Sequence, residues 1–162
     1  MPVPAMIATA AGEFHRNTSL LEKVVAGIPA EHWLSRPSDH SNHIAWIAGH
    51  MLWTRQILMD RLGTKWDHPG LEVFARSAKI EEGAAFLAPE ALLKAWREAS
   101  AELENMLENM TEEALAAPAP PGPPSPDGKL SGFVGVLAWH ETYHLGQLAY
   151  LRGWLGNPGI FG

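Results

Sequence analysis

Two histidines lie four residues apart in the stretch WHETYHLGQ, which covers residues 139–147. On an α-helix, side chains at this spacing are about 40° apart around the axis and about 6 Å apart along it, so His140 and His144 would project into the same space. Two imidazoles placed in this way can share one divalent cation. Because the chain has eight histidines in 162 residues, about 0.4 such pairs arise by chance, and the spacing alone predicts no metal site.

The surroundings of the pair favour a metal site more than the spacing does. Apolar residues such as Leu137 and Leu148 continue the same helical stripe in both directions, so the two histidines should face the core. Two neutral imidazoles in an aliphatic core need partners for both of their ring nitrogens, and a cation would satisfy that need. On the residues alone, hydrogen bonding to other core polar groups is an equal alternative.

A third ligand should come from another helix that faces the same interior. His50 is the best candidate, ahead of the less well placed His43 and His15, because Trp46 and Trp53 lie about one turn to either side of it in an apolar stretch. His43 lies two turns earlier, about 10.5 Å along a helix axis, and cannot share one ion with His50. The other histidines occur in polar or turn-like sequence and are expected to be ordinary surface residues: His15, His32, His40 and His68.

The letters HETYH also satisfy the HExxH signature of zinc metalloproteases. That active site needs a cleft beneath an edge strand and a third ligand further along the chain, and this sequence predicts neither. Glu141 would also point about 100° away from the face that carries His140 and His144. No side chain is therefore assigned as a general base, and the catalytic residues stay unknown.

Four amphipathic helices are predicted to position the histidines. Their limits follow from turn and capping signals: roughly residues 5–27, residues 43–62 after a cap at Ser41 or Asn42, residues 89–110 from Pro89, and a last helix from a cap at Ser131 to near Gly153. No segment alternates apolar and polar residues at period two for long. The sequence therefore predicts an all-α fold, a four-helix bundle with two long crossover connections.

The two long connections differ in character. Residues 64–88 contain Trp66, Phe74 and Phe86, which suggests a loop that packs back on the bundle and could roof a pocket. The stretch AAPAPPGPPSPDG is rich in proline and is interpreted as a structured crossover. Residues 1–162 are expected to form a single domain.

Composition narrows the range of partners. Lys and Arg number 12 against 18 Asp and Glu, and this net charge of −6 argues against nucleic acid. The chain has no cysteine, no basic leader segment and no apolar run near the ~18 residues of a membrane span. A cytoplasmic protein without a membrane partner is expected. A second apolar stripe in residues 43–62, formed by Trp46, Trp53 and Ile57, indicates either a core helix or a homodimer contact, and we expect a homodimer.

The sequence GHM around His50 and the sequence HETYHLGQL resemble the DinB/YfiT-like proteins. That family has a histidine in the second helix and the pattern His-x-x-x-His-x-Gly-Gln in the last, and the RPS at 36–38 is similar to its lead-in. The resemblance implies a helical bundle that holds a divalent metal, often nickel or zinc, through three imidazoles. The matching positions in this chain are His50, His140 and His144.

Two further residues match the family pattern. Gly146 would permit the close approach of another helix, and Gln147 could form a hydrogen bond near the site. The residues that contact a thiol in some relatives cannot be assigned to positions in this sequence.

The resemblance also implies a function. Three neutral imidazoles leave a cation its full charge and at least one open position. This favours a metal-dependent enzyme that acts on a small-molecule substrate, either a transferase for a low-molecular-weight thiol such as bacillithiol or mycothiol, or a hydrolase that uses metal-bound water. One alternative is a non-catalytic binding or stress-response bundle that is braced by its metal. Another is a metal-free bundle with hydrogen-bonded core histidines.

Overall fold

The computed structural model describes residues 3–75, 80 and 85–161, and long helices dominate them. The helices are α1 (Ala8–Val25), α2 (Ile44–Arg61), α3 (Pro89–Asn109), the short α4 (Glu112–Leu115) and α5 (Leu130–Trp154). Within the described ranges there is no strand, and an isolated bridge joins Pro118 to Lys129. The predicted all-α fold is confirmed. None of the described helices combines the length and the hydrophobicity that a membrane span requires.

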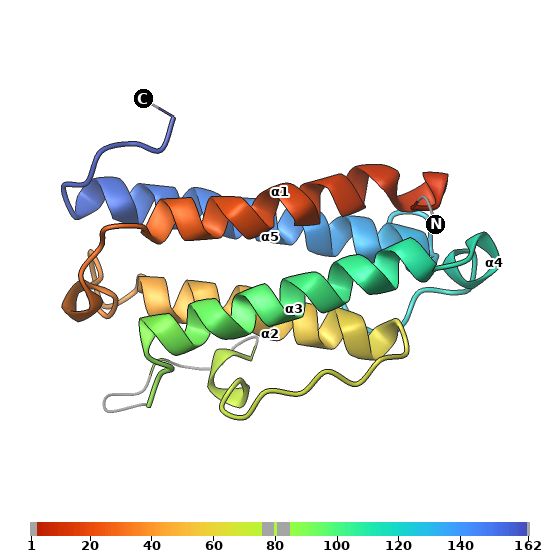
Figure 1. Cartoon of the computed structure of the whole chain (residues 1–162), viewed down its shortest axis with the longest axis horizontal. Coiled ribbons are helices and arrows are strands. Elements are labelled where there is room, and N and C mark those ends of the chain that lie inside the picture. Colours follow the sequence, from red (N-terminus) through yellow and green to blue (C-terminus); the bar gives the residue numbers. More distant parts are fainter. Residues whose placement is uncertain (1–2, 76–79, 81–84, 162) are drawn as a thin grey trace.

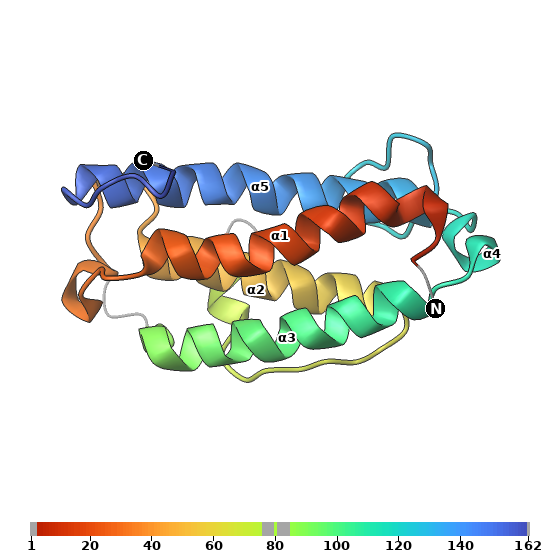
Figure 2. The ribbon, with the colours of Figure 1, turned by 45° about the horizontal axis from the view of Figure 1, so that its top comes forward.

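The four long helices form a bundle in which each helix has two neighbours. α1 packs on α5 and on α3, and α2 also packs on α3 and on α5. α1 and α5 run in one direction, and α2 and α3 run in the other (Figures 1 and 2). Because α2 and α3 are parallel, the chain between them must return along the bundle, as the yellow-green trace does in Figure 1. The proline-rich connection instead joins ends of α3 and α5 that lie at the same end of the bundle, so it does not run along the bundle as the predicted second crossover would.

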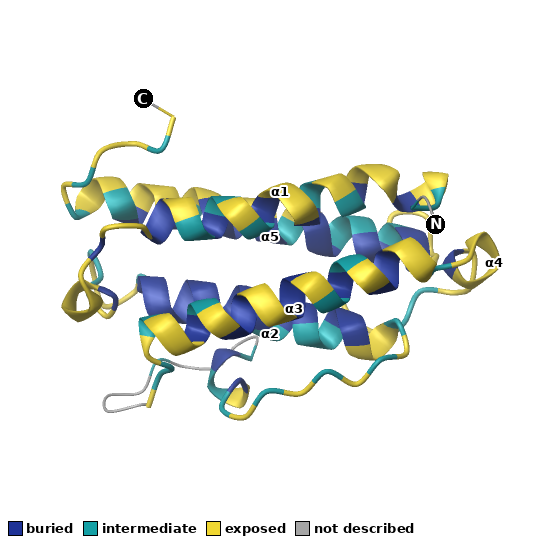
Figure 3. Cartoon of the chain, in the orientation of Figure 1, coloured by how far each residue is buried: buried dark blue, intermediate teal, exposed yellow. Residues whose placement is uncertain are grey.

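The buried faces of the long helices point toward one another across the bundle (Figure 3). α3 shows this most regularly, because Leu92, Trp96, Ala99 and Leu103 are all fully buried and recur at steps of four and three residues. Pro89 occupies the first turn of α3, as the sequence predicts. These contacts hold α2 and α5, the two helices that carry the candidate ligands, against each other.

The chain itself covers part of the second apolar stripe of α2, in which Trp46 is buried and Trp53 and Ile57 are half-buried. The side-chain oxygen of Gln56 accepts a hydrogen bond from the backbone nitrogen of His68 at 3.2 Å, and the fully buried Phe74 packs against Gly49. The expectation that this loop packs back on the bundle is confirmed. The homodimer stays a prediction. Exposed aromatic residues occur on α5: Trp139, Tyr143, Tyr150 and Trp154.

The N-terminus of α2 is capped by His43, so the predicted cap at Ser41 or Asn42 is wrong. The Nδ1 atom of His43 accepts a hydrogen bond from the backbone nitrogen of Trp46 at 3.0 Å. Burial, with a smaller contribution from the charge of Arg36, lowers the pKa of His43 to about 4. The ring is therefore neutral at pH 7 and can act as the acceptor that a helix N-terminus requires.

The N-terminus of α5 also differs from the prediction. The helix begins at Leu130, and Ser131 lies within its first turn instead of capping it. The hydroxyl of Ser131 donates to the Oδ2 atom of Asp127 at 2.8 Å, and the backbone nitrogen of Lys129 donates to Oδ1 at 2.9 Å. Ser131 cannot cap the helix because it lies inside the helix, after the N-cap position at Lys129, and the carboxylate of Asp127 organises this turn.

Candidate metal centre

The three predicted ligands come together between α2 and α5. The Nε2 atom of His140 lies 3.0 Å from Nε2 of His144 and 3.4 Å from Nε2 of His50. One ring nitrogen from each residue lies within 4.8 Å of the other two. Nitrogens bound tetrahedrally at about 2.0 Å are separated by about 3.3 Å, so the observed spacings suit ligands of one cation.

The ring of His50 is fixed in orientation and in tautomer. Its Nδ1 atom donates to the backbone oxygen of Phe74 at 2.7 Å. A carbonyl oxygen accepts but cannot donate, so Nδ1 carries the proton and the neutral ring presents a lone pair at Nε2. Trp46 stacks on the ring with centroids 4.8 Å apart, and Trp53 stacks at 5.6 Å. The two tryptophans expected beside His50 therefore hold its plane.

His144 is fixed in the same way from its own helix. Its Nδ1 atom donates to the side-chain oxygen of Gln147 at 2.7 Å. The amide nitrogen of Gln147 donates to the hydroxyl of Tyr143 at 3.2 Å, which is consistent with this orientation of the amide. Nε2 of His144 is thus also left as an acceptor, and Gln147 forms the hydrogen bond near the site that the resemblance implies.

With these tautomers, the three rings cannot supply a hydrogen-bond donor to every Nε2 acceptor in the cluster. Two acceptor nitrogens, from His50 and His144, face the same Nε2 atom of His140. That atom can carry at most one proton and can therefore satisfy only one of them. A cation accepts all three lone pairs at once, and hydrogen-bonded Nδ1 atoms are the usual support of metal-binding histidines. The donor set therefore fits a divalent metal.

The electrostatics of the cluster also favour neutral imidazoles. Burial lowers the pKa of His50, although the hydrogen bond to Phe74 opposes the shift. Burial lowers the pKa of His144 to about 4, against the opposing hydrogen bond to Gln147, and His50 adds a smaller lowering contribution. Both rings are unprotonated at pH 7, which is the state that binds metal.

A buried donor lies beside the cluster. The indole nitrogen of Trp46 is inaccessible to solvent and, among the residues that the structure describes, has no hydrogen-bond acceptor. Buried donors are rarely left unsatisfied unless a water or a bound molecule supplies the acceptor. Because the Trp46 ring lies on the His50 ring, this unsatisfied donor belongs to the immediate surroundings of the cluster.

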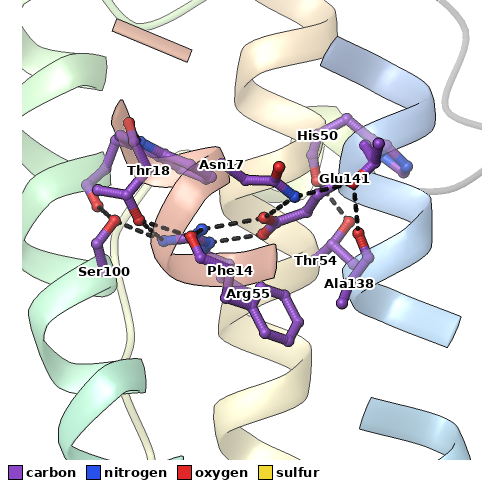
Figure 4. A network of polar contacts seen from close by, with 11 residues as sticks. Phe14, Asn17, Thr18, His50, Thr54, Arg55, Ser100, Ala138 and Glu141 are labelled. Carbon is purple, nitrogen blue, oxygen red and sulfur yellow. Dashed lines mark hydrogen bonds and ion pairs between the residues drawn. The ribbon is translucent and has the colours of Figure 1, made fainter. Parts of the chain in front are cut away.

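Glu141 belongs to a different network, which it forms with Arg55 and Asn17 (Figure 4). Its carboxylate accepts from the guanidinium of Arg55 at 2.6 and 2.9 Å and from the amide of Asn17 at 3.4 Å. Burial raises the pKa of Glu141, and the charge of Arg55 opposes that rise. The carboxylate is fully buried and engaged with Arg55, so it is not available to the histidine cluster as a general base, and the metalloprotease interpretation fails.

The same network ties the four long helices together. The guanidinium of Arg55 lies 3.7 Å from the ring centre of Trp96 and donates to Ser100, both on α3. It also donates to the backbone oxygen of Phe14, on α1, at 3.2 Å. Asn17, on α1, is buried and takes part in the network through its amide. One signal in the sequence could have revealed the network: an arginine and a glutamate that interrupt the apolar patterns of α2 and α5.

The remaining sequence candidates lie outside the cluster. His15 is exposed and pairs with Glu104 at 2.9 Å, and His43 caps α2. His32 and His40 are exposed. The expected role of Gly146 is wrong, because it faces outward and a Cβ atom there would meet nothing within 4 Å.

Comparison with known families agrees with this geometry. The profile of the DinB superfamily matches residues 13–148. The chain belongs to the DinB superfamily. The part of this DinB chain that matches includes all three histidines of the cluster together with Arg55 and Glu141. A comparison with curated proteins found no match.

Proposed function

We propose that this DinB-superfamily protein is a metal-dependent enzyme that acts on a small molecule. Its cation, nickel or zinc, would be held by the Nε2 atoms of His50, His140 and His144. One observation carries the proposal: Phe74 and Gln147 fix the tautomers of two imidazoles so that both lone pairs face the third.

The number of ligands supports catalysis. Within the described residues, the group of metal-binding side chains that converge has three members. Sites with three protein ligands keep a position for substrate, whereas structural sites are closed by a fourth ligand. When bound, the cation supplies Lewis acidity, which lowers the pKa of a thiol or of water. Both thiol transfer and hydrolysis follow from that chemistry, and a low-molecular-weight thiol is a suitable cosubstrate.

The protein's own residues would orient the imidazole ligands and admit the substrate. The carbonyl of Phe74 and the amide of Gln147 hold His50 and His144, and the stacked ring of Trp46 keeps water from one face of His50. His140 is half-buried, so the cluster lies near the surface, where a small molecule can reach it.

The test is a comparison of metal-free and metal-loaded protein. Protein loaded with nickel or zinc should conjugate a thiol to a chlorinated aromatic electrophile or hydrolyse an activated ester, and metal-free protein should not. His140→Ala should lose both the metal and the turnover. Turnover that persists in metal-free protein would contradict a metal-dependent reaction.

The alternative is a bundle in which the metal only braces the helices, and the burial of His50 and His144 is the observation that favours it. Exogenous imidazole separates the two proposals, because it can bind a cation only where a coordination position is open. A nickel-loaded protein whose metal absorption spectrum shifts with added imidazole supports the enzyme. A stoichiometric metal that neither shifts its spectrum nor supports turnover indicates the brace.

A further inference from the structure

A groove of about 560 Å³ lies beside the histidine cluster. One wall is the segment before α2, with Ser41 and Asn42, and the other wall is α5, with Tyr143, Gln147 and Tyr150. Small-molecule sites are concave regions of about 300–1,000 Å³ with an apolar lining and a few placed polar groups. The groove has the size and the mixed lining of such a site.

The wall of the groove is bonded to the cluster. Gln147 accepts the hydrogen bond from Nδ1 of His144 at 2.7 Å and donates to the hydroxyl of Tyr143 at 3.2 Å. Ile47, which also lines the groove, lies one turn before His50 on α2. A molecule in the groove would therefore lie one side chain away from two of the three imidazoles.

Gly146 keeps the floor of the groove open. It lies in the interior of α5, where glycine costs conformational entropy relative to alanine. No close packing requires a glycine there, because a Cβ atom would meet nothing within 4 Å. Gly146 lines the groove, and because it has no side chain it leaves space there.

The chemistry of the lining selects a class of ligand. Its side chains are aliphatic, phenolic, hydroxyl, amide or imidazole, and none of the described Asp, Glu, Lys and Arg residues lines the groove. Tyr143 and Tyr150 are two helical turns apart and exposed, so they offer ring faces to a flat apolar group. Ser41 and Asn42, on the opposite wall, offer hydrogen bonds.

From these observations we infer that the groove between residues 37–42 and α5 binds the substrate of the proposed enzyme, an uncharged small molecule with a flat apolar part and hydrogen-bonding groups. This inference rests on the proposed function for the role of the groove. The binding itself is a property of the protein without metal, and it can be tested separately.

The experiment uses metal-free protein labelled with 15N and a neutral probe, N-acetyl-L-phenylalaninamide. Saturable shifts are expected at the amides of Gly146, Gln147 and Tyr150. The side chain introduced by Gly146→Leu would fill the floor of the groove and should lower the affinity for the probe at least tenfold. This corresponds to about 1.4 kcal/mol of binding free energy. The charged analogue N-acetyl-L-phenylalanine should bind wild-type protein several times more weakly, because the groove offers its carboxylate no cation.

The matched control is Gly135→Leu. Gly135 is also a helical glycine of α5 with nothing within 4 Å of a Cβ atom, but it lines a separate hollow near Trp139. This variant should bind the probe like wild type. Gly146→Ala provides a second variant, with an unchanged or raised melting temperature and weaker probe binding, in case the leucine disturbs folding.

Three results would overturn the inference: unchanged probe affinity in both Gly146 variants, equal loss in Gly135→Leu, or no saturable shift at the groove at millimolar probe. Equal affinities for the neutral and the charged analogue would refute the inference that the groove prefers uncharged ligands. All samples are metal-free, so the probe-binding result does not depend on whether the protein binds metal. Likewise, a probe that does not bind in the groove does not contradict the proposed metal site.

Discussion

The Nδ1 atom of His50 donates a hydrogen bond to the backbone oxygen of Phe74, 24 residues further along the chain, at 2.7 Å. This contact joins the connection between α2 and α3 to the candidate metal centre. It depends on Gly49, because a Cβ atom at that position would overlap with the buried Phe74 ring. Gly49 therefore acts on the histidine cluster through Phe74, as a positioning residue.

Gly49→Ala should weaken metal binding. The Phe74 ring must move to admit the methyl group, and its carbonyl then moves away from His50. Loss of such a supporting hydrogen bond costs about 10- to 100-fold in metal affinity, and overpacking costs about 1–3 kcal/mol of stability. Calorimetric titration with zinc and urea unfolding measure the two effects. Gly135→Ala is the control because its site is open, and a Gly49→Ala protein with wild-type zinc affinity would refute the role of Phe74.

Gln147 can be tested with a conservative pair of variants. Gln147→Leu removes the acceptor for Nδ1 of His144 and should lower metal affinity about 10- to 100-fold. Gln147→Glu keeps an oxygen acceptor at the same reach and should restore most of that affinity. Competition with a chelating dye gives both constants. Equal affinities for the leucine and glutamate variants would show that the hydrogen bond has no part in holding the ligand.

The pair formed by Arg55 and Glu141 should contribute to folding and not to the reaction. Glu141→Ala leaves a buried guanidinium without its partner, which costs about 3–5 kcal/mol. The double variant Arg55→Met with Glu141→Leu removes both charges, so its cost should be well below the sum of the single costs. Urea unfolding of the wild type, Arg55→Met, Glu141→Leu and the double variant forms the cycle. If a stable Glu141→Gln protein bound metal normally yet lost all turnover, Glu141 would have to be reconsidered as a catalytic residue.

The stability of the metal-free protein should decrease as the pH is lowered from 6.5 to about 4. The pKa values of His43 and His144 are lowered from 6.5 to about 4 in the folded state. Below pH 6.5 the unfolded chain gains protons that the folded protein does not bind, so the stabilisation present above pH 6.5 is lost progressively down to about pH 4. Thermal melts across this range measure the slope.

His43→Asn tests that assignment. Asparagine can cap the helix but does not titrate, so the variant should show a shallower fall of melting temperature between pH 6.5 and about 4. A slope as steep as that of the wild type would mean that His43 is not one of the groups responsible.

The sequence was sufficient for the features that depend on local spacing. The helical pattern predicted α3 almost to its ends, and the spacing of four placed His140 and His144 on one face. His50 could be chosen because its apolar neighbours implied burial. The short α4 was missed because four residues are too few to show a helical period.

What the sequence could not supply are contacts between segments far apart in the chain. Every residue has a carbonyl group, so nothing in the letters marks Phe74 as the acceptor for His50. Arg55 and Glu141 are separated by 86 positions, and only the packing of α2 on α5 brings them together. The outward direction of Gly146 likewise depends on which face of α5 the other helices cover.

The most direct test of the central claim is the metal content of the protein and of His50→Ala, by elemental analysis alongside circular dichroism. We predict close to one equivalent of nickel or zinc per chain in the wild type after incubation with the ion. The His50→Ala protein should contain far less and keep its helix content. A wild-type protein that takes up no metal, or a His50→Ala protein that retains a full equivalent, would contradict a centre built from the imidazoles of α2 and α5.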